Sequence, residues 1–527
     1  MSKPPARMRG VIGTTVIVAM LVVPGSLTGW AAGPTTFIWG MAADADTMDN
    51  PVSTNGGTAA VTTQVFNPLV RMKQGQTEIE PDLATSWSVS PDGLTWTFKL
   101  RQGVTFHDGT PWNAEAAKFN LDRWADPQSP YHSVKGMDYQ YWNSMMAGVF
   151  REARAVDPYT LQIVLKQPNA PLVYNMSIIA FDFASPASIK QYGGQGVGLH
   201  PVGTGPYKFV EWVRDDHITL VANPTFFRKG LPKTQRIIMR VMKDNAARFL
   251  ALKSGEINAM ELPNPDDVKA ALADPNLAVT YRPPFNLGRL IFNMNDPLFK
   301  DIRIRQAVAL AINRKPIVDA LYGGYGVVAD QHMPPGMWGR AAVTGYPYDP
   351  AKARQLLAEA GYPNGFSFDF WYIPVGRAYF PNGKDIATAI ASDLGKVDIR
   401  ARLQTEDWST FLKDRYTNKF QLFMAGWNGD NGDPDDWLGV FFARHDANSS
   451  YFSYNNPTVF DLINKAKTET SQARRAQLYA EAETLIHNDY RDIPFAHSKV
   501  PLLLRKNVEG LVGQPDGSEY METVWLR

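Results

Sequence analysis

The sequence predicts a multidomain protein that mixes α-helices and β-strands. Its 527 residues can form roughly two to four ordinary domains. Hydrophobic residues make up 44% and aromatic residues 12%, which is enough for large packed cores and too much for a disordered chain. Strand-like and helix-like patterns are interspersed without strict alternation and without a repeat of about 20–50 residues, which excludes a solenoid. Because no low-complexity linker divides the chain, we expect domains that are joined by short crossings or built from discontinuous segments.

The N-terminal residues 1–33 have the pattern of a cleaved secretory signal peptide. A basic head is followed by a largely apolar run over 11–23, and Ala31, Ala32 and Gly33 offer small residues for cleavage. The apolar run is shorter than the roughly 20 residues that a membrane-spanning helix needs, so an uncleaved anchor is the less favoured alternative. The basic head consists of Lys3, Arg7 and Arg9.

The net charge and the absence of cysteine indicate the cellular compartment of the protein and exclude some classes of partner. The formal net charge is +1, from 53 Lys and Arg against 52 Asp and Glu. Such a mixed surface argues against nucleic acid or anionic lipid as the main partner. The chain has no cysteine, and therefore no disulfide and no thiol for lipid attachment. We expect the mature chain to be a soluble periplasmic protein, not a lipoprotein, that is held together by its core.

A hairpin and a capped helix are expected early in the mature chain. Within 86–101, Trp87 and Val89 precede a Pro-Asp-Gly turn, after which apolar and polar residues alternate with period two. After the turn HDGTPW, Asn113 can cap a helix with one apolar face. Further strands are expected at Thr160–Lys166, Tyr207–Trp212, Ile218–Ala222 and Ile237–Met242.

The second half of the chain carries clearer helix signals. Asp349 followed by Pro350 marks a helix start, and Gly361 ends the segment AKARQLLAEAG. Two more apolar stripes predict helices that face a core, the later one capped by Ser471. The stripes consist of Ile304, Ala307, Val308 and Ala311, and of Leu478, Ala482, Leu485 and Ile486.

Motifs of the common catalytic classes are absent from the sequence. There is no Gly-x-Ser-x-Gly elbow, no His-Glu-x-x-His pair, no Gly-x-x-x-x-Gly-Lys-Ser/Thr loop and no Gly-x-Gly-x-x-Gly. The eight histidines are scattered without ligand spacing, which together with the lack of cysteine argues against a closed zinc site. We therefore expect no enzyme, no metal and no cofactor, although carboxylate pairs leave little trace in a sequence.

Residues 426–438, GWNGDNGDPDDWL, place four aspartates among small residues and two tryptophans. Metal binding, acid–base catalysis, a surface loop and capture of a cationic ligand all use such residues. From the pattern alone, Asp430 between Gly and Asn favours an Asx-turn over a binding role. We expect Asp433, Asp435 and Asp436 to be turn and cap residues.

Five motifs, in this order along the chain, resemble the large peptide-binding class of ABC-transporter solute receptors (family 5, the peptide/nickel class). They are LATSWSVSPDGLTWTFKLRQGVTFHDGTPW, PVGTGPYKF, ALKSGEINAM, DIRIRQAVALAINR and YDPAKARQLLAEAGYPNGF, and they span essentially the whole mature chain. The resemblance implies an α/β fold of two lobes and three domains with a hinge between the lobes. The implied divisions are domain I (34–77, 204–290 and 505–527), domain II as an insertion (78–203) and domain III (291–504).

The C-terminal half is most similar to the periplasmic dipeptide-binding proteins of this class. The similarity rests on PVGRAYFPNG at 374–383 and on GWNGDNGDPDDWL. It implies that Arg377 holds the carboxylate of the ligand and that Asp430 holds its ammonium. The residues that it places beside these anchors are Tyr379, Trp427, Asn428 and Gly429 and, from the segment STNGGT, Asn55, Gly56 and Gly57.

The chemistry of these residue types agrees with capture of a free dipeptide. A dipeptide is a zwitterion, and enclosing it is costly unless each terminus meets an opposite charge with hydrogen bonds. Arg377 can present a planar fork to a carboxylate. Asp430, which can only accept hydrogen bonds when ionised, suits an ammonium. Side chains would then occupy roomy pockets walled by Trp427 and Tyr379.

The sequence thus favours a receptor that delivers a dipeptide or short peptide to the membrane permease components of an ABC importer and acts as a monomer. Other ligands on the same fold are haem, a nickel chelate, glutathione or an opine, and His445 is a candidate for the chelate. The alternative from a different class is an exported hydrolase that uses the carboxylates of 430–436.

Overall fold

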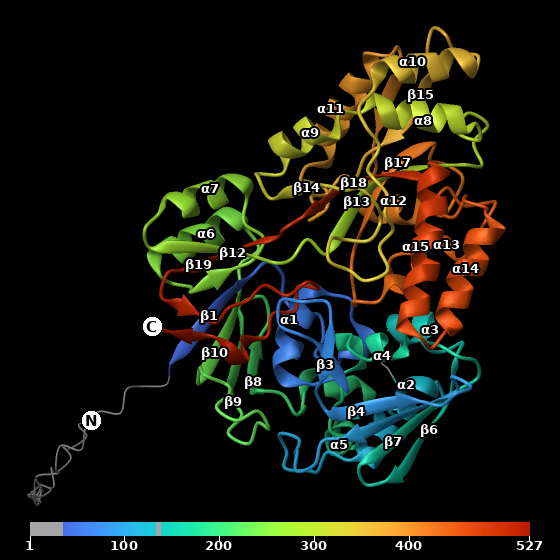
Figure 1. Cartoon of the computed structure of the whole chain (residues 1–527). Helices are drawn as coiled ribbons and strands as arrows, with labels where there is room; N and C mark the ends of the chain where they lie inside the picture. Colours follow the sequence, from blue (N-terminus) through green and yellow to red (C-terminus); the bar gives the residue numbers. More distant parts are fainter. Residues whose placement is uncertain (1–34, 133–138) are drawn as a thin grey trace, which may run out of the picture. The chain divides into compact units, whose positions relative to one another are not determined.

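The computed structural model describes residues 35–132 and 139–527, which form one compact unit from Thr35 onward. Its elements build three main β-sheets with helices packed around them (Figure 1). The predicted signal peptide at 1–33 lies outside the described residues. Over the described ranges, no helix is both long and apolar enough to cross a membrane.

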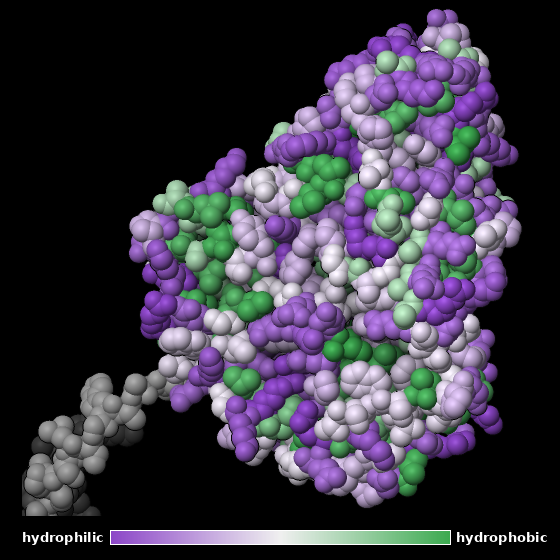
Figure 2. All heavy atoms as spheres, in the orientation of Figure 1, coloured by the Kyte–Doolittle hydropathy of each residue, from purple (hydrophilic) through white to green (hydrophobic). Residues whose placement is uncertain are grey.

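A seven-stranded sheet in the order β12-β19-β11-β1-β10-β9-β8 gathers strands from both ends of the chain. Strand β1 pairs in parallel with β10 and β11, and the other pairings are antiparallel. The strands are β1 (Thr36–Met41), β8 (Tyr207–Val213), β9 (His217–Ala222), β10 (Arg236–Val241), β11 (Ala259–Met260), β12 (Leu277–Tyr281) and β19 (Pro501–Arg505). The helices of this region are α1 (Gly56–Val65), α6 (Asn245–Ser254) and α7 (Pro265–Ala273). Figure 2 shows hydrophobic residues on the surface over α6 and α7, where Leu250 and Leu272 are exposed.

A four-stranded antiparallel sheet in the order β4-β5-β7-β6 contains the predicted hairpin. Trp96, Phe98 and Leu100 are buried, as the alternation predicts, and Asn113 caps α2 by accepting from Ala116 N over 2.9 Å. The strands are β4 (Ala84–Val89), β5 (Thr95–Leu100), β6 (Phe150–Asp157) and β7 (Thr160–Leu165). The helices are α2 (Ala114–Ala125), α3 (Gln140–Met145), α4 (Leu172–Asn175) and α5 (Pro186–Gly196).

A six-stranded mixed sheet in the order β14-β18-β13-β17-β15-β16 occupies the second half of the chain. Strand β15 runs parallel to β16 and β17, whereas β13 runs antiparallel to β17 and β18. The strands are β13 (Asn286–Phe292), β14 (Gly326–Val328), β15 (Ser367–Trp371), β16 (Arg400–Gln404), β17 (Leu422–Asn428) and β18 (Asp492–Ser498). The helices are α8 (Ile302–Ala311), α9 (Arg314–Leu321), α10 (Pro350–Glu359), α11 (Gly383–Gly395), α12 (Trp408–Asp414), α13 (Gly439–Phe442), α14 (Pro457–Thr468) and α15 (Gln472–Asn488).

The predicted helix signals of this half are confirmed. Asp349 caps α10 by accepting from Lys352 N, and Ser471 caps α15. Gly361 follows α10 with a φ of +92°, a conformation that suits glycine at a helix end. The apolar stripes of α8 and α15 lie in a core that belongs to the six-stranded sheet, separate from the core of the four-stranded sheet. Two short pairs complete the strands: β2 (Val70–Met72) with β3 (Ile79–Pro81), and β20 (Val508–Glu509) with β21 (Trp525–Leu526).

The chain crosses between the seven-stranded and six-stranded sheets twice. The first crossing joins β12 to β13 and the second joins β18 to β19. Asn286 lies at the end of the first crossing, and Ser498 lies at the start of the second. Asn286 Nδ2 donates to Ser498 O over 2.8 Å, and Ser498 N donates to Asn286 Oδ1 over 2.9 Å. The two crossings are thus tied side by side, as a two-segment hinge between lobes requires. The first lobe holds the seven- and four-stranded sheets, and the second lobe holds the six-stranded sheet. The predicted domain limits at 290 and 504 fall within β13 and β19.

Candidate ligand-binding site

The two predicted charged anchors lie in loops that leave the same edge of the six-stranded sheet. Arg377 and Tyr379 follow β15, and Asp430 follows β17. Because β15 and β17 pair in parallel, their carboxyl ends meet at one edge. In mixed α/β sheets this is the edge at which ligands bind. The hinge lies at this edge too, since β13 begins here at Asn286, opposite Asn428.

Tyr379 is fixed against two glycines of the sheet. A Cβ atom at Gly426 would clash with the ring of Tyr379, and one at Gly288 would lie 2.5 Å from its carbonyl oxygen. Tyr322 Oη donates to that carbonyl over 2.8 Å, and Ser498 Oγ donates to Ala378 O over 2.6 Å. The loop therefore has little freedom, and the ring of Tyr379 is held as a buried wall beside β17.

Arg377 is exposed and carries an unneutralised charge. Its guanidinium lies 4.7 Å from the ring centre of Trp408, which orients it without neutralising it. Its backbone is held by paired hydrogen bonds with Phe380. Within the described ranges, no carboxylate forms an ion pair with Arg377. Burial raises the pKa of the Tyr379 hydroxyl, and Arg377 and Arg415 act in the opposite direction, so both cations lie near that ring.

Asp430 receives a hydrogen bond from the other lobe. Tyr141 Oη, on α3, donates to Asp430 Oδ1 over 2.8 Å, and Asp430 N donates to Asp436 Oδ2 over 2.8 Å. No lysine or arginine of the described chain forms an ion pair with Asp430. Burial raises the pKa of Asp430 to about 7, the Tyr141 hydrogen bond opposes this shift, and the charge of Asp516 adds to it. Asp430 is thus a desolvated carboxylate without a cation among these residues.

Asp436 orients the groups around Asp430. Besides accepting from Asp430 N, it accepts from Trp427 Nε1 over 3.3 Å. Trp427 in turn meets the ring of Phe441 edge to face, with ring centres 5.5 Å apart. Burial and the neighbouring Asp430 hold the pKa of Asp436 well above its usual range.

The other aspartates of the stretch have structural partners. Asp433 caps the short 3-10 helix Pro434–Asp436, and both of its oxygens accept from Arg475 over 2.7 Å. Asp435 accepts from Tyr479 Oη over 3.3 Å. The expectation that these residues build the turn is therefore confirmed for Asp433 and Asp436. Among the four aspartates of this stretch, Asp430 is the one whose carboxylate meets the opposite lobe by way of Tyr141.

Asn428 and Gly429 connect β17 to this carboxylate. Asn428 is exposed, and Gly429 N donates to Phe285 O of the hinge crossing over 3.0 Å. A Cβ atom at Gly429 would clash with the ring of Phe285 and would lie 2.6 Å from an atom of Trp437. The sheet therefore places Asn428, Gly429, Trp427 and Asp430 together.

The segment Asn55–Gly57 lies in the first lobe at the start of α1. Asn55 Oδ1 accepts from Gly57 N over 2.7 Å and caps the helix. A Cβ atom at Gly57 would lie 2.6 Å from Ala43 O, whereas Gly56 is exposed with open space around it. No hydrogen bond between described residues joins this segment to Arg377 or Asp430, so its place in the site stays a prediction.

Further contacts join the two lobes near this edge. Asn431 Nδ2 donates to Asn175 Oδ1 over 3.1 Å, and Ala170 N donates to Lys467 O over 2.7 Å. A Cβ atom at Gly432 would clash with the carbonyl of Thr77. Contact between the lobes thus contributes to the burial of Asp430.

Nothing in the sequence identifies Tyr141, Asp516 or Trp408 as site residues. Tyr141 lies on a six-residue helix of the insertion, and Asp516 lies in the C-terminal loop. Their relation to Asp430 arises from contact between distant segments, and no spacing in the sequence signals it. Among the described residues, no group of His, Asp and Glu is arranged to hold a metal ion, and His445 is exposed.

The chain is similar to bacterial solute-binding proteins over most of its length. Residues 78–449 match the model of the bacterial extracellular solute-binding proteins, family 5. The dipeptide-binding protein of Escherichia coli is 35% identical over 90% of this chain and 92% of its own. Heme-binding protein A of Haemophilus influenzae is 36% identical over 86% of this chain and 85% of its own. The solved structure of HbpA2 from Haemophilus parasuis superposes with a TM-score of 0.87 at 31% identity, covering 93% of this chain and all of that one.

Proposed function

The chain belongs to family 5 of the bacterial extracellular solute-binding proteins, and we propose that it is a periplasmic receptor that encloses a dipeptide or short peptide between its lobes. It then delivers this ligand to the permease components of an ABC importer. The ligand belongs at the edge of the six-stranded sheet, where the lobes meet beside the hinge.

The observation that supports the proposal is a pair of charged side chains without counter-ions. Asp430 has no cationic partner and Arg377 has no anionic partner among the described residues, although their loops leave the same sheet edge. A desolvated carboxylate without a counter-ion is unfavourable, and a ligand ammonium would relieve it. The exposed fork of Arg377 can take the ligand carboxylate bidentately. A zwitterion whose two ends lie two residues apart satisfies both groups at once.

Calorimetry with three forms of one dipeptide tests the proposal. The free dipeptide should bind, whereas its N-acetylated form and its C-terminal amide should each bind much more weakly, because each lacks one of the two charges. Mass spectrometry of ligand released from the purified protein should identify peptides. Equal affinity for all three forms, or release of a ligand without an ammonium and a carboxylate, would overturn the assignment.

Relatives with other ligands define the alternative outcomes. Heme-binding protein A of Haemophilus influenzae shares about as much identity with this chain as the dipeptide receptor does. Haem, glutathione or an opine carried by the purified protein would therefore replace the peptide. A catalyst using Asp430 would consume an added peptide mixture, whereas a receptor should carry the peptides intact through gel filtration.

A further inference from the structure

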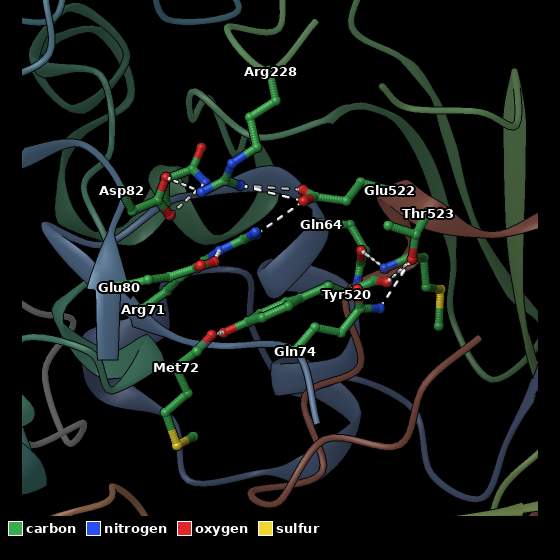
Figure 3. Close-up of polar contacts among 12 residues, drawn as sticks. Gln64, Arg71, Met72, Gln74, Glu80, Asp82, Arg228, Tyr520, Glu522 and Thr523 are labelled. Carbon is green, nitrogen blue, oxygen red and sulfur yellow. Dashed lines mark hydrogen bonds and ion pairs between the residues drawn. The ribbon is translucent and has the colours of Figure 1, made fainter. Parts of the chain in front are cut away.

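Arginines form a network of ion pairs in each lobe. In the first lobe, Arg71 and Arg228 both pair with Glu522, over 3.0 and 3.3 Å (Figure 3). Arg228 also pairs with Asp82 over 2.8 Å. Glu522 lies in the C-terminal segment, so this network holds that segment to the framework of the first lobe. The network of the second lobe differs, because it reaches a predicted wall of the ligand site.

The second-lobe network is built on Arg289, an arginine of β13 that is only 1% exposed. Its Nη1 donates to Asp492 Oδ2 over 2.9 Å, and its Nη2 donates to Tyr451 Oη over 3.0 Å. The other oxygen of Asp492 lies 2.6 Å from His332 Nε2, and His332 Nδ1 lies 2.8 Å from Glu483 Oε1. Burial lowers the pKa of His332, but the charges of Asp492 and Glu483 outweigh burial and raise the pKa to about 9. Asp492 is therefore shared between two buried cations.

Aromatic rings cover the rest of the Arg289 guanidinium. Its Cζ lies 3.8 Å from the ring centre of Phe441, and 5.6 and 5.3 Å from those of Phe442 and Tyr451. Its Nε is buried and has no hydrogen-bond partner in the described chain. Burying a cation is costly unless neighbouring groups replace its water, and the face of an aromatic ring does so in part. Because rotation of Phe441 would remove this contact, Arg289 holds the ring of Phe441 in place.

Phe441 transmits this constraint to Trp427. The two rings lie at 90° with their centres 5.5 Å apart, an arrangement that aromatic pairs favour. The indole Nε1 of Trp427 also donates to Asp436 Oδ1 over 3.3 Å. Trp427 is half-buried and precedes Asp430 by three residues. One ring contact and one hydrogen bond therefore orient a side chain that the proposed function assigns to the wall of the ligand pocket.

We propose that Phe441 and Arg289 are positioning residues, which hold the ring of Trp427 and so determine how large a ligand side chain the site accepts. The inference rests on the proposed function, because Trp427 affects selectivity only if it forms a wall of the ligand pocket. Neither positioning residue has to touch the ligand. When the ring of Phe441 is removed, the ring of Trp427 can move into the vacated volume, since protein interiors are otherwise closely packed. The pocket should then accept larger side chains.

Fluorine NMR of protein labelled with 5-fluorotryptophan tests the positioning role. The resonance of Trp427 is identified as the one that is lost in Trp427→Phe. It should move in Phe441→Leu, because the edge-to-face contact is lost. Arg289→Lys keeps a charge beside Asp492 but lacks the planar face, so it should move the resonance too. This second variant tests the role even if Phe441→Leu does not fold.

Phe442→Leu is the matched control. Phe442 follows Phe441 in the sequence, is also buried and lies beside the same guanidinium. In the described chain its ring meets those of His332, Phe441 and Tyr454, and not that of Trp427. Both variants replace a buried phenylalanine by leucine, so both should lower the melting temperature, whereas Phe441→Leu alone should move the resonance of Trp427.

Calorimetry with Ala-Ala and Phe-Phe tests the effect on selectivity. In Phe441→Leu, the ratio of the two affinities should shift in favour of Phe-Phe by at least about threefold, the size expected when one aromatic contact is lost. Phe442→Leu should keep the native ratio.

The outcomes separate this inference from the proposed function. An unmoved Trp427 resonance in Phe441→Leu, or an equal movement in Phe442→Leu, would overturn the positioning role whatever the ligand is. If the resonance moves and the ratio between Phe-Phe and Ala-Ala stays native, the role in selectivity is wrong while the receptor function stands. If neither dipeptide binds the native protein, the proposed function fails, and the role in selectivity fails with it.

Discussion

The hydroxyl of Tyr141 donates a hydrogen bond to Asp430 Oδ1 over 2.8 Å, and this bond joins α3 of the first lobe to the loop after β17 in the second. The same carboxylate is the proposed anchor for a ligand ammonium. One group therefore carries two tasks, because it accepts a contact between the lobes and binds the ligand. Closure of the lobes around a bound ammonium should strengthen both interactions of Asp430, because it removes water from the Tyr141 hydroxyl and from the ammonium at the same time.

Asp430→Asn should weaken binding of a free dipeptide by roughly 2–5 kcal/mol. The substitution keeps the shape of the side chain and removes the charge that the ammonium meets. An N-acetylated dipeptide should bind the native protein poorly and lose little more in the variant. Asp435→Asn should change affinity by less than about 1 kcal/mol, because the partner of Asp435 is the structural residue Tyr479. Calorimetry with both peptides, on the native protein and on each variant, measures these affinities. An undiminished affinity in Asp430→Asn would show that another residue binds the ammonium.

Arg377→Ala should weaken binding of a free dipeptide by about 2–5 kcal/mol and leave the fold intact, because Arg377 is exposed and outside the core. Binding of the C-terminal amide should change far less. Arg377→Lys should recover part of the loss, since lysine keeps the charge but lacks the planar fork. Equal losses for the acid and the amide would show that Arg377 does not read the carboxylate.

Tyr141→Phe should weaken ligand binding by about 1–2 kcal/mol, because Asp430 loses the hydrogen bond that helps to keep it ionised. Tyr139→Phe is the matched control. The Tyr139 hydroxyl is buried two residues away and has no hydrogen-bond partner among the described residues. Small-angle scattering should also show a less complete decrease in radius of gyration on ligand binding in Tyr141→Phe. Identical affinity in both variants would remove the role assigned to this bond.

Affinity for a free dipeptide should fall as the pH is lowered from about 8 to about 5. With its pKa near 7, Asp430 carries a proton in most ligand-free molecules below that pH. An ammonium needs the ionised form, so the proton must leave on binding, and affinity falls by up to about tenfold per pH unit. Calorimetry in buffers of different ionisation enthalpy measures this proton release. A pH profile in Asp430→Asn as steep as the native one would contradict the prediction.

The raised pKa of Asp430 affects the stability of the ligand-free protein in the opposite direction: stability falls as the pH rises, whereas ligand affinity increases. Between the ordinary value of 3.8 and the folded value of about 7, the folded state binds the extra proton. This contribution to the free energy of unfolding is present at low pH and is lost as the pH rises through 7. Ligand-free Asp430→Asn should therefore melt above the native protein at pH 8 and close to it at pH 5, as thermal unfolding by circular dichroism would show.

The mature protein should begin near Ala32 or Gly33 and be recovered in the periplasmic fraction without a lipid. The expectation follows from the basic, apolar and small-residue pattern of 1–33 and from the absence of cysteine. Intact-protein mass spectrometry after fractionation measures it. Recovery in the membrane pellet with Met1 still present would show an uncleaved anchor instead.

Local sequence patterns predict many of the helices and strands. Asp349 and Ser471 start α10 and α15 because their side chains satisfy free backbone N–H groups at the first turn. The alternation around Trp96 and Phe98 predicts a strand with one buried face. Such signals depend on neighbours in the sequence. The ordered motifs of the chain indicate the same family that the comparisons identify.

Patterns in the sequence are sufficient to predict the local elements, the family and the residue types that suit a zwitterion. Which groups surround Asp430 depends instead on tertiary contacts. Parallel pairing of β15 and β17 brings the Arg377 loop to the Asp430 edge, and contact between the lobes adds Tyr141 from α3. The charge of Asp516, in the C-terminal loop, acts on the same carboxylate. The reason is physical: desolvation and electrostatic contact depend on distance in space, and residues hundreds of positions apart leave no spacing from which that distance can be inferred.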